Sequence, residues 1–144
     1  MDRYERISFV VPFKEIADLL TPLTSFECDT FPNEISVDFR IGLVGLKPIH
    51  RYHVKLLITP YHLTIKVGDS FNMNEAYSES AAMSVDTKGT LLTGNVDGQF
   101  TVHMEKIKIV AKGIYKVQCI LTDHENDKES ELHKLETYFS VDKK

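Results

Sequence analysis

Six histidines make metal coordination the first chemistry that this sequence suggests. His50 and His53 lie three positions apart, and His62 follows further along the chain. Metal ligands must converge on one point, whereas residues three apart on a strand point to opposite faces of the sheet. His53 and His62 would become neighbours if a hairpin joined their segments. Because this spacing leaves a tetrahedral ligand set incomplete, and because no HExxH or CxxC motif occurs, we expect no metal site.

Acidic residues near the C-terminus raise the question of a calcium loop. Asp123, Glu125 and Asp127 occupy alternate positions, as the first ligands of such a loop do. The glycine that permits the sharp turn of a calcium loop is missing, however, and Lys128 follows directly. We therefore expect an acidic, solvated hairpin loop at residues 123–131.

Nucleophilic and phosphate chemistry find little support in the sequence. Cys28 is flanked by Glu27 and Asp29, whose charges oppose formation of a thiolate, and no G-x-S-x-G motif is present. Residues 42–45 lack the lysine and hydroxyl side chain of a phosphate-binding loop. We expect Cys28 and Cys119 to be free thiols, with Cys119 packed in the core. These observations predict a protein that needs no cofactor and is not an enzyme.

The elements that position these residues are predicted to be strands. Residues 35–41 alternate apolar and polar side chains, and a period of two places one set on each face of a strand. The same period predicts further strands at residues 7–13, 52–59, 62–67, 90–93, 100–109, 115–122 and 135–141. A slip of the apolar phase after Met104 predicts a bulge near Glu105 and Lys106.

Other local patterns complete the expected secondary structure. The short link through Pro60 and Tyr61 favours a hairpin between the strands at 52–59 and 62–67. Apolar residues at Ile16, Leu19 and Leu20 favour a short amphipathic helix over residues 14–20. A helical turn is expected near residues 76–83. We therefore predict one all-β domain over residues 1–144, an antiparallel β-sandwich of about seven or eight strands with one short N-terminal helix.

The C-terminal segment resembles the end of bacterial immunoglobulin-like modules. In those modules a turn glycine opens a "G-x-Y-x-V" strand, which the sequence matches at residues 113–117, and a hairpin returns the last strand beside it. The match covers roughly the last thirty residues. It implies an immunoglobulin-like β-sandwich of bacterial or phage origin with an unassigned role. It transfers no catalytic residue, and the chain has no tryptophan to supply the core of antibody domains.

Three apolar residues of the C-terminal strands are out of phase with the expected core. Tyr138 alternates with Phe139 and Val141, and Ile114 and Ile120 alternate with Tyr115, Val117 and Cys119. Ile114, Ile120 and Tyr138 therefore predict an apolar second face. Either the N-terminal helix or the long polar segment covers this face, or it binds a partner or a second copy of the chain.

Composition narrows the classes of partner. The formal net charge is −4 and the pI is about 5.8, which disfavours nucleic acid and anionic membranes as main partners. We see neither a signal peptide nor a membrane-spanning run, so we expect a cytoplasmic protein. Our main hypothesis is a non-catalytic domain that binds another protein or itself.

Two further hypotheses remain open at this point. The first is a small-molecule or sugar site within residues 70–99, because loops carried on a scaffold of strands often bind ligands. The second is a metal-dependent hydrolase that uses His53, His62 and a nearby carboxylate.

Overall fold

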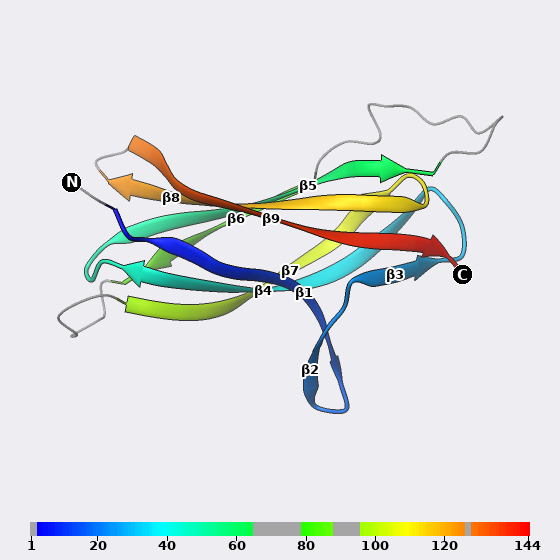
Figure 1. Ribbon diagram of the computed structural model, residues 1–144, viewed down its shortest axis with the longest axis horizontal. Coiled ribbons are helices and arrows are strands. Elements are labelled where there is room, and N and C mark those ends of the chain that lie inside the picture. The colour runs from blue at the N-terminus through cyan, green and yellow to red at the C-terminus, as the bar shows by residue number, and fades with distance from the viewer. Residues whose placement is uncertain (1–2, 65–78, 88–95, 126–127) are drawn as a thin grey trace.

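The protein consists of two β-sheets that lie over one another, as the computed structural model of residues 3–64, 79–87, 96–125 and 128–144 shows (Figure 1). The all-β prediction is confirmed. The four-stranded sheet has the order β2-β1-β4-β7, with strands β2 (Leu19–Pro22), β1 (Arg6–Ile16), β4 (Asn33–Leu46) and β7 (Val96–Ile109). The five-stranded sheet has the order β3-β9-β8-β5-β6, with strands β3 (Ser25–Cys28), β9 (Lys128–Lys143), β8 (Gly113–Glu125), β5 (Arg51–Leu63) and β6 (Glu79–Asp86).

Side chains from both sheets form one hydrophobic core between them. The period-two pattern sets which residues enter it, because alternate side chains of a strand share a face. Most of the expected inward residues of four strands are buried, while Ile35 and Leu135 are half-buried. The buried residues are Val37, Phe39 and Ile41 of β4, Tyr52, Val54, Leu56 and Ile58 of β5, Tyr115, Val117, Cys119 and Leu121 of β8, and Phe139 and Val141 of β9. Cys28 and Cys119 are both buried free thiols, as expected. Burial raises the pKa of the Cys119 thiol to about 12.

Bulges adjust the phase of several strands, among them β7 and β1. The predicted bulge of β7 is confirmed, because the register with β4 shifts between Met104 and Ile107, and Lys106 adopts a φ of 58°. A second bulge, which the sequence analysis missed, lies in β1 between Ile7 and Phe9. It exchanges the faces of this strand, so that Val10 is buried while Phe9 is only half-buried.

The expected helix over residues 14–20 is wrong. β1 runs on to Ile16 and turns back into β2, with Ile16 paired to Leu19. Ala17 and Asp18 form the turn with φ values of 52° and 64°, the positive pair that a two-residue hairpin of type I′ requires. An amphipathic helix must bury its apolar face, whereas Leu19 is 69% exposed on a hairpin that projects from the sandwich (Figure 1).

The expected hairpin at Pro60 and Tyr61 is also wrong, because β5 is one strand from Arg51 to Leu63. Its register with β8 shifts between Pro60 and His62, which makes Tyr61 the extra residue of a bulge. A bulge tolerates proline, which lacks the N–H of a regular ladder. Residue 67, where the expected second strand ends, lies outside the described residues.

Two further expectations need correction. The described part of the helical turn expected at residues 76–83 belongs to strand β6, which pairs with β5. The expected strand at residues 90–93 lies outside the described residues. The sheets are not purely antiparallel, since β3 runs parallel to β9.

Gly45 supplies a testable position in this framework. Its φ is 73°, and a Cβ atom there would lie 2.6 Å from the backbone oxygen of Tyr4. We expect Gly45→Ala to lower the free energy of unfolding by roughly 1–3 kcal/mol, because strain and a backbone clash act together. Urea denaturation measures this. Gly98→Ala is the matched control, since a Cβ at Gly98 meets no atom within 4 Å. Equal losses in the two variants would contradict the strain argument.

Candidate functional site

The three apolar residues that the sequence analysis singled out lie on the outer face of the five-stranded sheet. Tyr138 is 40% exposed and Ile114 is 38% exposed, while Ile120 is half-buried. The N-terminal segment that was expected as a cover belongs to the other sheet. The ring of Tyr138 packs at a tilt against that of Tyr61, with 5.0 Å between centroids. Tyr61 is itself 61% exposed.

These residues do not form one continuous apolar face. Ile114 pairs with His62 across to β5, beside the bulged Tyr61. Ile120 lies further along β8 and pairs with Lys55 on one side and Lys134 on the other. The structure therefore groups Tyr61, Tyr138 and Ile114, which we call the tyrosine patch, and separates Ile120 from it. Sequence reasoning missed Tyr61 because it treated that residue as part of a turn.

The histidine pair of the hydrolase hypothesis does not assemble. His53 and His62 lie on the same strand, β5, nine positions apart. A strand rises about 3.3 Å per residue, which separates them by roughly 30 Å. His50 precedes β5, and its Nε2 lies 2.5 Å from Oδ1 of Asp123 on β8.

A buried ionic cluster occupies the end of the sandwich where β5 begins. Arg3 donates to both carboxylate oxygens of Glu5, at 3.0 and 2.5 Å, and to Oδ2 of Asp123 at 2.7 Å. Glu5 is 1% exposed and Asp123 is 5% exposed. Buried carboxylates are unfavourable unless they are paired, and Arg3 provides this pairing. Asp123 is therefore not part of a solvated acidic loop, contrary to expectation.

Hydroxyl groups extend this cluster to the loops around it. The Tyr52 hydroxyl donates to Oε2 of Glu5 at 3.0 Å and accepts the backbone N–H of Lys47 at 2.8 Å. The Thr87 hydroxyl accepts the backbone N–H of His50 and donates to the Lys47 carbonyl. Burial is the main reason that the pKa of Tyr52 rises to about 12. The hydroxyls thus hold the β4–β5 connection in place.

The charges in the cluster stay ionised at neutral pH. Burial acts to raise the pKa of Glu5, but hydrogen bonds from Arg3, its own backbone and Tyr52 outweigh it and bring the pKa down to about 2. The pKa of Asp123 is likewise lowered, because hydrogen bonds from Arg3 and His50 outweigh the effect of burial. Each carboxylate is committed to partners within the fold, so the cluster stabilises the structure rather than offering a free acid or base.

A second polar group lies on the outer face at the same end of the sheet. His53 of β5, His124 of β8 and Glu129 of β9 each offer a ligand atom, and these atoms lie within 4.8 Å of one another. His53 Nδ1 is 2.8 Å from Oε1 of Glu129, and the two imidazole rings stack at 4.4 Å. The metal hypothesis had identified His53 but paired it with the wrong histidine. The i, i+2 alternation that buries Asp123 also turns His124 outward, which was the available signal.

Two further histidines form contacts elsewhere in the fold. His103 lies on β7 with Asp38 and Glu105 around its ring, and the hydrogen bond with Asp38 is the main cause of its raised pKa. This imidazole is 54% exposed. His133 Nδ1 accepts the backbone N–H of Ile7 at 2.9 Å and so links β9 to β1.

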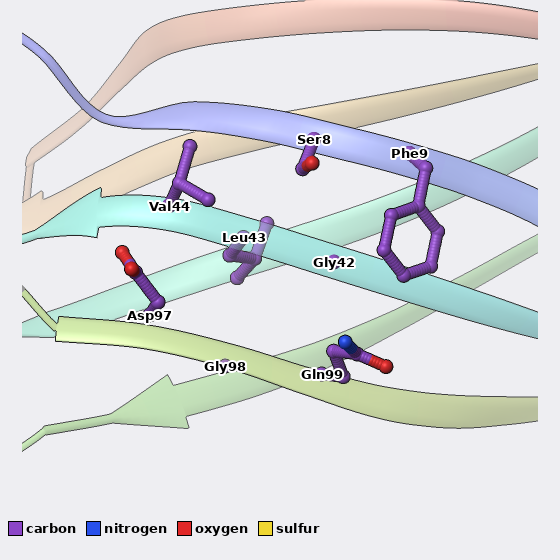
Figure 2. A pocket seen from close by; sticks show the side chains of 8 residues that line it. All are labelled: Ser8, Phe9, Gly42, Leu43, Val44, Asp97, Gly98 and Gln99. Carbon is purple, nitrogen blue, oxygen red and sulfur yellow. The ribbon is translucent and has the colours of Figure 1, made fainter.

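An open hollow lies on the outer face of the four-stranded sheet (Figure 2). It forms beside Gly98, where a Cβ atom would meet nothing within 4 Å, and the ring of Phe9, which lies over Gly42, borders it. Its volume is about 210 Å³, below the range of usual small-molecule pockets. Asp97 already accepts the N–H of Gly45, and Gln99 contacts Arg40. Within residues 70–99, the described part therefore offers limited support for a ligand site.

No family model matches this chain, and no curated protein matches it. Among the described residues, no helix has the length and apolar character that crossing a bilayer requires.

The ionic cluster predicts a specific dependence of stability on pH. The pKa of Glu5 is lowered from 4.5 to about 2, so its contribution is complete above pH 4.5 and is lost as the pH falls through 2. We expect the free energy of unfolding to fall by on the order of 2–3 kcal/mol across this interval because of Glu5. Urea denaturation between pH 2 and 7 measures it.

The variant Glu5→Gln should make this pH dependence shallower. Glu34→Gln is the control, because Glu34 is an exposed carboxylate outside the cluster. If Glu5→Gln kept the full wild-type slope, the cluster would not be the source of the acid sensitivity.

Proposed function

We propose that this chain is a non-catalytic protein-interaction domain that docks another protein on the tyrosine patch. The observation that carries the proposal is the pair of exposed, packed rings of Tyr61 and Tyr138 next to Ile114. Tyrosine is enriched at protein interfaces because it provides a large apolar surface together with a polar hydroxyl. The three residues of the patch come from the adjacent strands β5, β8 and β9 of one sheet, whose pairing limits the entropy lost on binding.

The charges around the patch indicate the chemistry of the partner. Directly beside the patch, Lys116 lies opposite Tyr138, and Glu136 accepts a hydrogen bond from the Tyr138 hydroxyl at 3.4 Å. From the patch as far as Ile120, the described outward charges are three lysines and one carboxylate; these residues are Lys55, Lys116, Lys134 and Glu136. This stretch of the outer face is therefore basic, although the chain as a whole carries a net charge of −4. A partner segment that combines apolar side chains with carboxylates complements it.

The same charges disfavour a second copy of the chain as the partner. In a two-fold symmetric contact, the same surface of both copies meets itself. Such a contact would bring this basic stretch, including Lys116 opposite Tyr138, against the same basic stretch of the second copy. Like charges in an interface oppose association. We therefore commit to a different protein as the occupant.

The immunoglobulin-like relationship is part of this proposal. In variable-type immunoglobulin sheets, strands G, F, C and C′ are neighbours in one sheet, while A, B and E lie in the other. The order β9-β8-β5-β6 and the order β1-β4-β7 follow the same arrangement, with the strands in the same sequence along the chain. Topology thus supports the relationship, while a bacterial or phage origin stays a prediction.

A tyrosine at the start of β8 adds support. Tyr115 is buried, and its hydroxyl donates to the carbonyl of Ala111 at 2.7 Å, four residues upstream. A tyrosine with this bond marks the corner before strand F in immunoglobulin domains. The match departs from that pattern in one respect, because Tyr115 stands four residues before Cys119 instead of two.

A displayed library of random peptides, panned on the immobilised full chain, tests the docking proposal. We expect the enriched peptides to combine aromatic or aliphatic residues with aspartate or glutamate. Their affinity should fall at least tenfold for the double variant Tyr61→Ser, Tyr138→Ser, since truncation of central aromatic side chains removes most binding energy. Fluorescence anisotropy with labelled peptides measures the affinities.

Tyr4→Ser is the matched control, because Tyr4 is 69% exposed outside the patch. Peptides that bind the double variant as tightly as the wild type would overturn the proposal, as would a library without enrichment. Sedimentation of the chain alone tests the remaining alternative, in which a second copy of the chain is the occupant. A dimer that Tyr138→Ser dissociates would show that the occupant is a second copy.

A further inference from the structure

We infer that His53, His124 and Glu129 bind a divalent transition-metal ion, for which zinc is the best fit. The three residues come from adjacent strands β5, β8 and β9, so the sheet order brings them together although they are distant in sequence. His124 and Glu129 are direct partners in the β8–β9 ladder. Glu129 also reaches across β8 to contact His53 on the far strand.

The ligand types select the class of metal. Imidazole nitrogens suit zinc, copper, nickel and iron, whereas calcium and magnesium prefer a shell of oxygen atoms. Two histidines and one carboxylate are a common set of three protein ligands for zinc, with a fourth position left to water. The cluster therefore has the donors for binding, and the inference concerns binding rather than catalysis.

Independent support comes from an unsatisfied atom within the cluster. Nδ1 of His124 is buried, yet no group among the described residues forms a hydrogen bond with it. Burial of a polar atom without a partner is unfavourable, so such atoms are rare in folded proteins. The other two groups of the cluster, His53 and Glu129, are hydrogen-bonded to each other. A metal ion bound through Nδ1 of His124 would satisfy this atom, and His53 and Glu129 would exchange their mutual hydrogen bond for bonds to the ion.

The distances require only a small adjustment. Ligand atoms around a tetrahedral zinc ion at 2.0–2.2 Å lie about 3.4 Å apart. The candidate atoms lie within 4.8 Å of one another, and the His53–Glu129 contact is already closer than the zinc geometry. The side chain of Glu129 is 56% exposed, so it can rotate without disturbing the core.

Neighbouring charges on the same face set the strength of binding. Arg51 and Lys55 lie two positions before and two positions after His53 on β5. Arg51 also interacts with another group of the protein. Glu131 pairs with Thr122, the residue beside His53, and adds negative charge. Two cations near the cluster oppose a divalent ion, while two carboxylates attract it. We therefore expect binding of moderate affinity.

Calorimetric titration of the untagged full chain with zinc chloride tests the inference. We expect one ion per chain, and at least about a tenfold loss of affinity in each of His53→Ala, His124→Ala and Glu129→Gln, because each removes one ligand. Glu129→Gln keeps the size of an exposed side chain, so its loss of binding would not reflect misfolding. Cobalt in place of zinc adds a second readout, the visible absorption of a coordinated ion, which should weaken in the same variants.

His103→Ala is the matched control. It removes an exposed histidine that also lies beside two carboxylates, but on the other sheet. Its affinity for zinc should equal that of the wild type. The inference is overturned if the wild type does not bind at about 100 µM zinc, which corresponds to a weak site. It is also overturned if His103→Ala abolishes binding while Glu129→Gln retains it. Because the tyrosine patch takes no part in the titration, this outcome is independent of the docking proposal.

Discussion

The burial of one face of each sheet against the other is the constraint on which the remaining features depend. Phe39 and Ile41 of one sheet and Leu56 and Val117 of the other belong to the same core cluster. Each inward residue fixes its neighbours as outward, because side chains alternate along a strand. The outward positions of Tyr138 and His124 therefore follow from the burial of Phe139 and Asp123. Packing, which is not itself functional, decides what the surface presents.

At the end of the sandwich where β5 begins, the apolar core gives way to the buried ionic cluster. Arg3 lies before β1 and bonds Glu5 and Asp123, so one guanidinium joins the N-terminal segment to the five-stranded sheet. Such an arrangement is favourable only when every buried charge has a partner. The cost of leaving a carboxylate unpaired explains why Tyr52 and His50 also donate to this cluster. The same contacts fix the connection that leads into β5.

Two outer surfaces follow from this framework, and they lie towards opposite ends of β5 and β8. The tyrosine patch is an exposed aromatic pair beside Lys116 and Glu136, and it is the surface on which we propose that a protein docks. The cluster of His53, His124 and Glu129 lies on the outer face of the sheet, where β5 begins and β8 ends, at the same end as the ionic cluster. One surface is therefore apolar and the other is rich in ligand atoms, although both belong to the same face of the same sheet. Their separation along the strands keeps the proposed docking surface apart from the proposed metal site.

The sequence by itself determined the inward faces of β4, β5 and β8 and the bulge at Lys106, because alternation and its slips are local properties of the chain. It also placed Ile114 and Tyr138 outside the core. Local patterns did not decide between helix and hairpin at residues 14–20, since a short apolar run fits both until a partner strand is known. Only the tertiary structure decided that β5 continues past Pro60 and that Glu129 meets His53. Such contacts depend on which strands become neighbours, and the order of strands in a sheet is set by the packing of the whole chain.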